Sequence, residues 1–279
     1  MQTIRSLAEL RAAMMVLRHD HGSVAFVPTM GALHEGHLTL VREARRKADH
    51  VVASIFVNPM QFGPNEDLAA YPRREAEDAA KLAAERVALL WLPDVATMYP
   101  AGYATSISVG GLDAVLCGAA RPGHFNGVAT VVAKLFNQVA PDIALFGEKD
   151  WQQLAIIRRM AIDLDLHVEI AGVPTVREPD GLAMSSRNAY LTPEQRGAAS
   201  ALPTALFDAV EKLGNRTAVA PILDRAKAAM LSAGFASIDY LDLRDGDSLE
   251  AVDTARAGAR LFVAARIGAT RLIDNISIG

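Results

Sequence analysis

The alternation of short apolar runs with helical segments constrains the fold of this chain more than any other feature of its sequence. Short, mainly apolar runs without a polar–apolar alternation are typical of strands buried on both faces of a parallel sheet. Five such runs, rich in β-forming residues, lie at 23–28, 50–59, 87–93, 142–147 and 167–176. Helical periodicity separates them at 37–49, in the second half of 67–86, at 127–140 and at 151–165. This order predicts βαβ units with right-handed crossovers, and therefore a doubly wound parallel sheet.

The pattern changes after residue 176. Thr192-Pro193-Glu194 is typical of a helix start, because threonine caps the first turn and proline suits the first helical position. A second helix is expected at 219–233, followed by three alternating runs typical of a small antiparallel sheet, at 237–245, 259–268 and 270–278. The predicted fold class is α/β: a Rossmann-like doubly wound parallel sheet domain over 1–176 and a smaller α+β domain with a three-stranded antiparallel sheet over 177–279.

Composition and charge exclude several classes of protein. Hydrophobic residues make up 51% and charged residues 22% of the chain, which fits a globular protein with a full core. Lysine and arginine number 28 against 32 acidic residues, a net charge of −4, so the basic footprint of a nucleic-acid-binding protein is missing. The single cysteine, Cys117, excludes an internal disulfide framework and suits a reducing compartment.

Apolar runs are too short for a membrane protein. None approaches the ~18 residues that a membrane span needs. At the N-terminus, Glu9 and Arg11 interrupt the apolar stretch, which predicts an amphipathic helix instead of a signal peptide. We therefore expect a cytoplasmic protein with no nucleic-acid and no membrane partner.

The most informative segment is VPTMGALHEGHLTL at 27–40, which has the layout strand, glycine-containing loop, helix start. Such a start binds anions, because backbone amides and the helix dipole both favour negative charge. His34 and His37 face the same way on one turn and could stabilise a leaving pyrophosphate. The alternatives are zinc, for which H-E-G-H has the wrong spacing, and an ordinary surface helix. The motifs of P-loop enzymes and of common dinucleotide dehydrogenases are missing.

Further polar segments follow other predicted strands. Lys149, in FGEKDWQQL, is suited to phosphate oxygens, although it could instead pair with Glu148 or Asp150 at the surface. Gln61 and Asn58 follow the second strand. One of the two glutamines that open the next helix, at 152 and 153, can bind a substrate hydroxyl or carboxylate.

Hydroxyl groups and cations mark two more candidate segments. MSSRN at 184–188 places two serines beside Arg187, which suits phosphate binding, although a turn with a capping serine would look the same. Arg121 and His124 precede a predicted helix, and a histidine in such a place is more often structural than catalytic.

Together, these segments resemble the pantoate–β-alanine ligase (pantothenate synthetase) family, within the HIGH-motif nucleotidyltransferase superfamily. The matching stretches run in the family's order and cover most of the chain: PTMGALHEGH (28–37), FVNPMQFGPNEDL (56–68), RPGHFNGVATVV (121–132), FGEKDWQQL (146–154) and MSSRN (184–188). The last takes the place of the lysine-rich KMSKS loop usual in the wider superfamily. The family condenses (R)-pantoate with β-alanine to pantothenate, through a pantoyl adenylate, and releases AMP and diphosphate.

The resemblance also implies roles for individual residues. His37, His34, Lys149 and Arg187 would be catalytic. The ATP site would comprise Met30, Gly31, His34, His37, Gly147, Glu148, Lys149, Asp150, Val176, Met184, Ser185, Ser186 and Arg187. Gln61 and Gln153 would bind pantoate or β-alanine. Mg²⁺ would arrive with ATP, and Asp78, beside Glu77, is a loosely matched candidate ligand.

Other consequences follow from the same resemblance. It implies a homodimer and a second domain that closes as a lid over the water-sensitive adenylate. Two rivals stay open on the residues alone: a HIGH-motif nucleotidyltransferase acting on a phosphate ester, and a nucleotide-sensing or RNA-binding module. A phosphate-ester site would need more cationic groups, and the acidic balance disfavours RNA.

Overall fold

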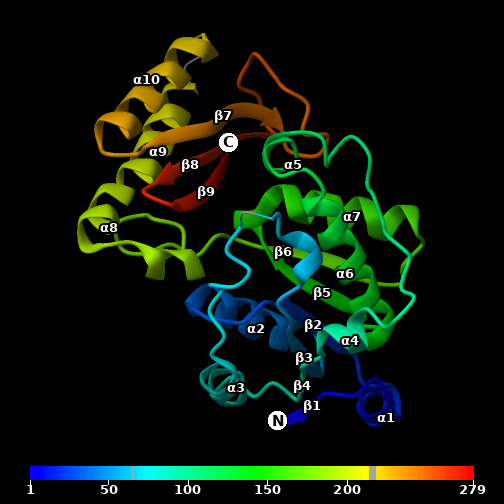
Figure 1. Ribbon diagram of the computed structural model, residues 1–279. Helices are drawn as coiled ribbons and strands as arrows, with labels where there is room; N and C mark the ends of the chain where they lie inside the picture. The colour runs from blue at the N-terminus through cyan, green and yellow to red at the C-terminus, as the bar shows by residue number, and fades with distance from the viewer. Residues whose placement is uncertain (65, 214–217) are drawn as a thin grey trace. The chain divides into compact units, whose positions relative to one another are not determined.

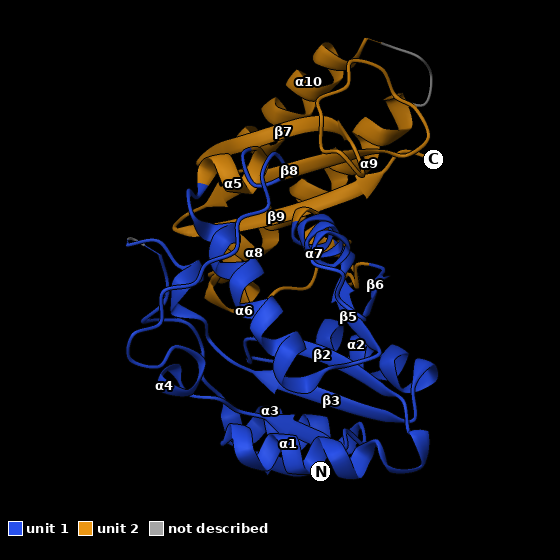
Figure 2. Cartoon of the chain, turned by 90° about the vertical axis from the view of Figure 1, so that its right-hand side faces the viewer, with its two compact units in different colours: residues 1–114, 121–148, 153–174 blue, residues 115–120, 149–152, 175–279 orange. Residues whose placement is uncertain are grey.

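The computed structural model describes residues 1–64, 66–213 and 218–279, and the chain divides into two compact units (Figure 2). Unit 1 comprises residues 1–114, 121–148 and 153–174. Unit 2 comprises residues 115–120, 149–152 and 175–279. Two short pieces from within the first 176 residues, 115–120 and 149–152, therefore belong to unit 2. That residues 1–176 form a nucleotide-binding domain and residues 177–279 form a lid stays a prediction.

The described part of unit 1 is built on a parallel sheet in the order β1-β4-β3-β2-β5-β6 (Figure 1). Its strands are β1 (Gln2–Ile4), β2 (Val24–Thr29), β3 (His50–Ile55), β4 (Leu89–Trp91), β5 (Ile143–Gly147) and β6 (Glu169–Val173). The five apolar runs of the sequence account for β2 to β6, which confirms the predicted parallel sheet. The amphipathic helix expected at the N-terminus is present as α1 (Leu7–Leu17), but it is preceded by a strand, because Gln2–Ile4 pairs with β4.

The strand order reverses between β2 and β5. From β2 the chain adds β3 and β4 on one side, and it later adds β5 and β6 on the other. Ligands of doubly wound sheets bind outside the carboxyl ends of the strands at such a switch point. The first residues after the two strands at this switch point are Met30, which follows β2, and Glu148, which follows β5.

Helices cover both faces of this sheet. On one face α2 (Glu35–Lys47) and α3 (Glu75–Ala84) contribute to a buried apolar cluster with β2, β3, β4 and β5. On the other face Phe136, from α6 (His124–Val139), packs edge-on against Phe26 of β2, with ring centroids 6.5 Å apart. The remaining described helices before residue 176 are η1 (His19–His21), η2 (Pro59–Gln61), α4 (Val95–Met98), α5 (Leu116–Ala120), η3 (Glu148–Asp150) and α7 (Trp151–Asp163).

Unit 2 contains the antiparallel sheet β7-β8-β9, as the alternating runs predict. Its strands are β7 (Ser237–Asp245), β8 (Ala259–Ile267) and β9 (Thr270–Ser277), and its helices include η4 (Ser186–Tyr190), α8 (Pro193–Ala199), α9 (Ala201–Leu213) and α10 (Val219–Ser232). α9 and α10 pack on this sheet around a buried core that includes Leu206, Met230 and Val263 (Figure 1). Thr192 caps α8 as expected, and its hydroxyl accepts the N–H of Gln195 at 3.3 Å. Among the described residues, no helix has the length and apolar character of a membrane span.

Candidate active site

The start of α2 presents two imidazoles side by side. His34 is the N-cap of the helix, and its Nδ1 accepts the backbone N–H of Gly36 at 3.2 Å. The Nδ1 of His37 accepts the backbone N–H of His34 at 3.3 Å, and the two ring centroids lie 4.1 Å apart. The prediction that the two histidines share one side of the helix is therefore confirmed.

These contacts also fix where each neutral ring carries its proton. A nitrogen that accepts a hydrogen bond has no hydrogen of its own, so the proton of each neutral imidazole lies on Nε2. Two Nε2–H donors at the N-terminus of a helix form an arrangement that favours a bound anion, since the helix dipole acts in the same direction.

The loop between β2 and α2 has an unusual backbone that a buried carboxylate stabilises. Gly31 and Ala32 have φ values of +86° and +51°, and for alanine this left-handed region costs about 1–2 kcal/mol. Asp78, on α3, is 1% exposed and accepts the N–H of Ala32 at 2.7 Å and of Leu33 at 2.8 Å. Lys81, one turn later, donates to the carbonyl of Leu33 at 2.8 Å. α3 thus holds the loop by three hydrogen bonds.

The same contacts bear on Asp78 as a candidate Mg²⁺ ligand. Each of its carboxylate oxygens already accepts a backbone N–H, and the side chain is buried. Glu77 is paired with Lys81 at 2.7 Å, and this ion pair is the main reason why its pKa is lowered. Residues 1–64, 66–213 and 218–279 contain no group of three or more acidic, histidine or cysteine side chains placed to hold a metal. The geometry suits Asp78 to supporting the loop.

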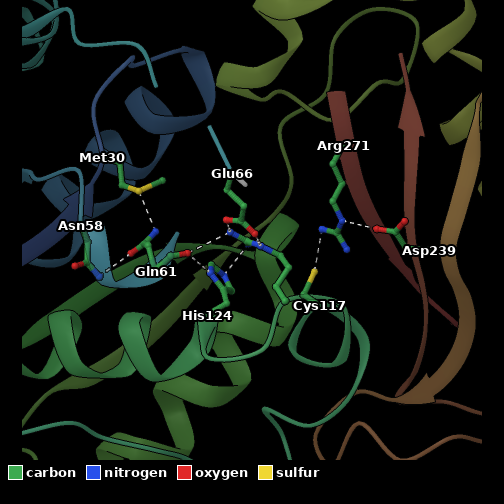
Figure 3. Close-up of polar contacts among 9 residues, drawn as sticks. Met30, Asn58, Gln61, Glu66, Cys117, His124, Asp239 and Arg271 are labelled. Carbon is green, nitrogen blue, oxygen red and sulfur yellow. Dashed lines mark hydrogen bonds and ion pairs between the residues drawn. The ribbon is translucent and has the colours of Figure 1, made fainter. Parts of the chain in front are cut away.

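Both polar atoms of the Gln61 side-chain amide form hydrogen bonds, as Figure 3 shows. It ends the short turn η2 after β3 and is 9% exposed. Its Nε2 donates to the sulfur of Met30 at 2.9 Å, and its Oε1 accepts from Asn58 Nδ2 at 3.2 Å. Met30 follows β2 and Gln61 follows β3, so two predicted site residues that come after different strands are in contact.

The backbone of Gln61 is held as well. Its carbonyl accepts from Arg121 at 3.3 Å and from Nδ1 of His124 at 2.8 Å (Figure 3). Arg121 also pairs with Glu66 and lies 3.0 Å from Nε2 of His124. Burial alone would raise the pKa of Glu66, but the hydrogen bond and charge of Arg121 outweigh it and lower that pKa. His124 thus helps to hold the backbone of Gln61, and the expectation that its role is structural stays a prediction.

Gly127 permits this arrangement. A Cβ atom at this position would lie 2.2 Å from the carbonyl oxygen of Met60 and 2.7 Å from the backbone nitrogen of Gln61. The carbonyl of Gly127 in turn accepts from Asn58 Nδ2 at 3.0 Å. The start of α6 thus packs directly against the turn that carries Gln61, and only glycine leaves room for that contact.

In unit 2, two segments with predicted phosphate contacts are anchored in different ways. The carbonyl of Lys149 accepts from Asn275 Nδ2 at 2.8 Å. In the other segment, Met184 donates its N–H to the carbonyl of Val176 at 3.0 Å, and the Ser185 hydroxyl accepts the N–H of Arg187 at 3.2 Å. The turn with a capping serine, considered above as an alternative, is therefore present, and it presents Ser186 and Arg187 in η4.

The structure thus distributes the predicted site residues over both units. Unit 1 carries Met30, Gly31, His34, His37, Gln61, Asp78, Gly147, Glu148 and Gln153, and unit 2 carries Lys149, Asp150, Val176, Met184, Ser185, Ser186 and Arg187.

Of the two glutamines at the start of α7, Gln152 is engaged with the backbone. Its side chain is 6% exposed, and its amide bonds to the carbonyl of Val115 at 2.8 Å and to the N–H of Cys117 at 3.0 Å.

Sequence reasoning missed several supporting residues. Cys117 has no cation beside it in the sequence, yet Nη1 of Arg271 lies 3.3 Å from its sulfur, and Nε of Arg271 pairs with Asp239 (Figure 3). Asn275 and Asp78 gave no signal for their supporting roles either, because the groups that they hold lie 126 and 46 residues away in the sequence.

Comparison with known proteins gives one consistent answer. A family model described as "Pantoate-beta-alanine ligase" matches residues 2–277. A pantothenate synthetase of Sphingopyxis alaskensis is 63% identical over 279 residues, which is 100% of both chains. One from Novosphingobium aromaticivorans is 64% identical over 284 residues, with 100% and 99% coverage.

Solved structures agree with these relatives. The crystal structure of pantothenate synthetase from Thermus thermophilus superposes with a TM-score of 0.94 at 50% identity and covers 100% of this chain and 99% of that one. A Francisella tularensis pantoate–β-alanine ligase, described as complexed with β,γ-ATP and β-alanine, superposes with a TM-score of 0.85 at 33% identity, over 99% and 97% of the two chains.

Proposed function

The chain belongs to the pantoate–β-alanine ligase family, and from this premise we propose how its own residues carry out the ATP-dependent joining of pantoate to β-alanine. In the first step a pantoate carboxylate oxygen attacks the α-phosphorus of ATP, the bond to the leaving diphosphate breaks, and pantoyl adenylate forms. In the second step the β-alanine amine attacks the acyl carbon, loses a proton and displaces AMP. Pantothenate, AMP and diphosphate are the products.

Charge repulsion between the carboxylate and the triphosphate is the main obstacle to the first step. We assign the neutralising groups to His34 and His37 at the start of α2, and to Lys149 and Arg187 in unit 2. Mg²⁺ enters with ATP as part of the substrate. Ser185 and Ser186 add hydroxyl donors, and no protein atom forms a covalent bond in this scheme. Catalysis is then positioning and electrostatic stabilisation, as in other phosphoryl-group chemistry.

The single observation that carries this proposal is the pair of imidazoles at the N-terminus of α2. Both rings accept a backbone N–H group at Nδ1, so each neutral ring carries its proton on Nε2. We assign the surrounding ATP contacts to Met30 and Gly31, to Gly147, Glu148 and Asp150, and to Val176 and Met184. Gln61 and Gln153 form the acid pocket, because a neutral amide bonds hydroxyls and a carboxylate without reducing the positive field.

Isotope exchange between ATP and diphosphate tests the mechanism. Pantoate alone should support exchange, while release of AMP should require β-alanine as well. Exchange that depends on β-alanine, or formation of ADP, would rule out the adenylate. Phosphate esters serve as control substrates, and they should support no exchange.

The assembly and the location of the enzyme are further parts of the proposal. The family resemblance leads us to propose a cytoplasmic homodimer whose C-terminal residues close over the adenylate. Light scattering coupled to size-exclusion chromatography tests the dimer, and a monomer at micromolar concentration would overturn it.

A further inference from the structure

Lys149 follows β5 of unit 1 in the sequence, yet residues 149–152 belong to unit 2. The hydrogen bond from Asn275 Nδ2 to the carbonyl of Lys149, 2.8 Å long, ties this segment to β9. Asn275 is 3% exposed, so losing this bond would leave a buried polar group without its partner.

The amide of Asn275 is itself oriented by a buried cation. Arg260, on β8 and 9% exposed, donates to Oδ1 of Asn275, which directs the Nδ2 group toward Lys149. The guanidinium carbon of Arg260 lies 3.5 Å from the ring centroid of Trp151, a cation–π contact. The indole N–H of Trp151 donates to the carbonyl of Gly246 at 2.6 Å. Both ends of the short segment 149–151 are thus fixed to the same sheet.

The neighbouring residue on β9 anchors the other cationic segment. Asp274 is 2% exposed and forms a bidentate ion pair with Arg177 at 2.6 and 2.9 Å. Arg177 also donates to the carbonyl of Gly181 at 2.9 Å, and it pairs with Ala183 across a β-bridge just before the MSSR segment. β9 additionally packs against η4, which carries Ser186 and Arg187.

We propose that Asn275 and Asp274 are positioning residues for adenylate formation, which hold Lys149 and the 185–187 segment in fixed relation on adjacent positions of β9. This inference rests on the proposed roles of Lys149 and Arg187 in binding the ATP phosphates. Because transition-state stabilisation falls quickly as the stabilising group moves away, a displacement of Lys149 or Arg187 by about 1 Å costs on the order of 100-fold in rate. Neither residue needs to touch a substrate for this effect.

The test uses two changes at Asn275 in the full-length enzyme. Asn275→Asp keeps an oxygen for Arg260 but places a second oxygen against the Lys149 carbonyl, and Asn275→Leu removes both contacts. Each should lower the ATP–diphosphate exchange rate about 10- to 100-fold, with the KM for pantoate unchanged. Thr270→Val, a buried polar position at the far end of β9, is the matched control and should stay within about 2-fold of wild type.

A double-variant cycle separates positioning from general destabilisation. In a Lys149→Ala background, Asn275→Asp should cost less than about 3-fold, because the side chain that it positions is gone. Full additivity of the two changes, or exchange by Asn275→Asp within about 3-fold of wild type, would overturn the inference. Thermal unfolding of each variant identifies one that fails to fold, in which case the isosteric Asn275→Asp decides.

Failure of the proposed function looks different in the same experiment. If Lys149→Ala alone exchanges at the wild-type rate, the assignment of Lys149 to the phosphates is wrong, and the inference falls with it. If Lys149→Ala is inactive while both Asn275 variants are normal, the assignment survives and only the inference is overturned.

Discussion

The two groups of residues assigned to the ATP phosphates are built in opposite ways. The two imidazoles at the start of α2 are oriented by near neighbours in the chain, since His34 and His37 bond to backbone groups within three residues, although Asp78 on α3 holds the loop before them. The backbone carbonyl of Lys149, by contrast, accepts a hydrogen bond from Asn275, which lies 126 residues away in the sequence. A locally built site can be recognised from a motif, whereas a site held from a distance is exposed to substitutions that no motif contains.

The largest effect should come from the groups that contact the phosphates. His37→Ala and Lys149→Ala should each lose about 100- to 1,000-fold in pantoate-dependent ATP–diphosphate exchange, the usual loss for one preorganised donor. Lys47→Ala, an exposed lysine at the end of α2, is the control for the loss of a charge. If Lys149→Ala were as active as Lys47→Ala, Lys149 would not contact the phosphates, and the contrast between the two groups of phosphate-binding residues would no longer hold.

Substitutions in the acid pocket should give the next largest effect, and they should change the KM for pantoate instead of the exchange rate. Gln61→Leu and Gln153→Leu should each raise the KM for pantoate about 10- to 100-fold, since an unpaired buried polar group costs roughly 1–3 kcal/mol. The affinity for ATP, measured by calorimetry, should change little. Loss of ATP affinity with a normal pantoate KM would move these glutamines to the nucleotide site.

A substitution of Asp78 tests how far its hydrogen bonds to the loop before α2 stabilise the fold. Asp78→Asn turns one of the two acceptors of the Ala32 and Leu33 N–H groups into a donor, which should cost about 1–3 kcal/mol in the free energy of unfolding. Denaturant titration gives the stability, and Glu77→Gln on the same helix is the control. Unchanged stability together with weaker binding of Mg²⁺-ATP would indicate that Asp78 serves the metal instead of the loop.

The smallest effect concerns pH and the Arg121–Glu66 ion pair. The pKa of Glu66 lies below its usual value in the folded protein, so the pair stabilises the fold at neutral pH. That contribution is lost as the pH falls from the ordinary glutamate pKa of about 4.3 down through the lowered one. Thermal unfolding over this acidic range should show a shallower pH dependence for Glu66→Gln than for the wild type. Identical slopes would mean that the pair contributes nothing.

The sequence predicted more of the fold than of the site's support. Short apolar runs located β2 to β6, and alternating runs located the three strands of unit 2, because a strand buried on both faces and a strand buried on one face each have a recognisable hydrophobic pattern. β1 escaped notice, since two of its three residues, Gln2 and Thr3, are polar and it does not form an apolar run like the one at 87–93 that marks β4. The local pairing of His34 with His37 followed from their spacing alone.

Support from distant side chains could not be predicted in the same way. Asp78 stood out as an acidic residue and suggested a metal, but its contacts depend on how α3 packs against the loop after β2. The Arg260–Trp151 contact joins residues on β8 and at the start of α7, which no local pattern relates. Such contacts become visible only when the chain is folded.

The two tryptophans of the chain provide separate optical reports on its two units. Trp91 is fully buried in β4 of unit 1 and donates to Gln138 at 3.0 Å. Trp151 lies in unit 2, stacked under the guanidinium of Arg260 beside the Lys149 segment. Fluorescence from Trp151, isolated by Trp91→Phe, therefore senses the surroundings of the proposed phosphate lysine, while Trp91 in a Trp151→Phe chain reports on the parallel sheet.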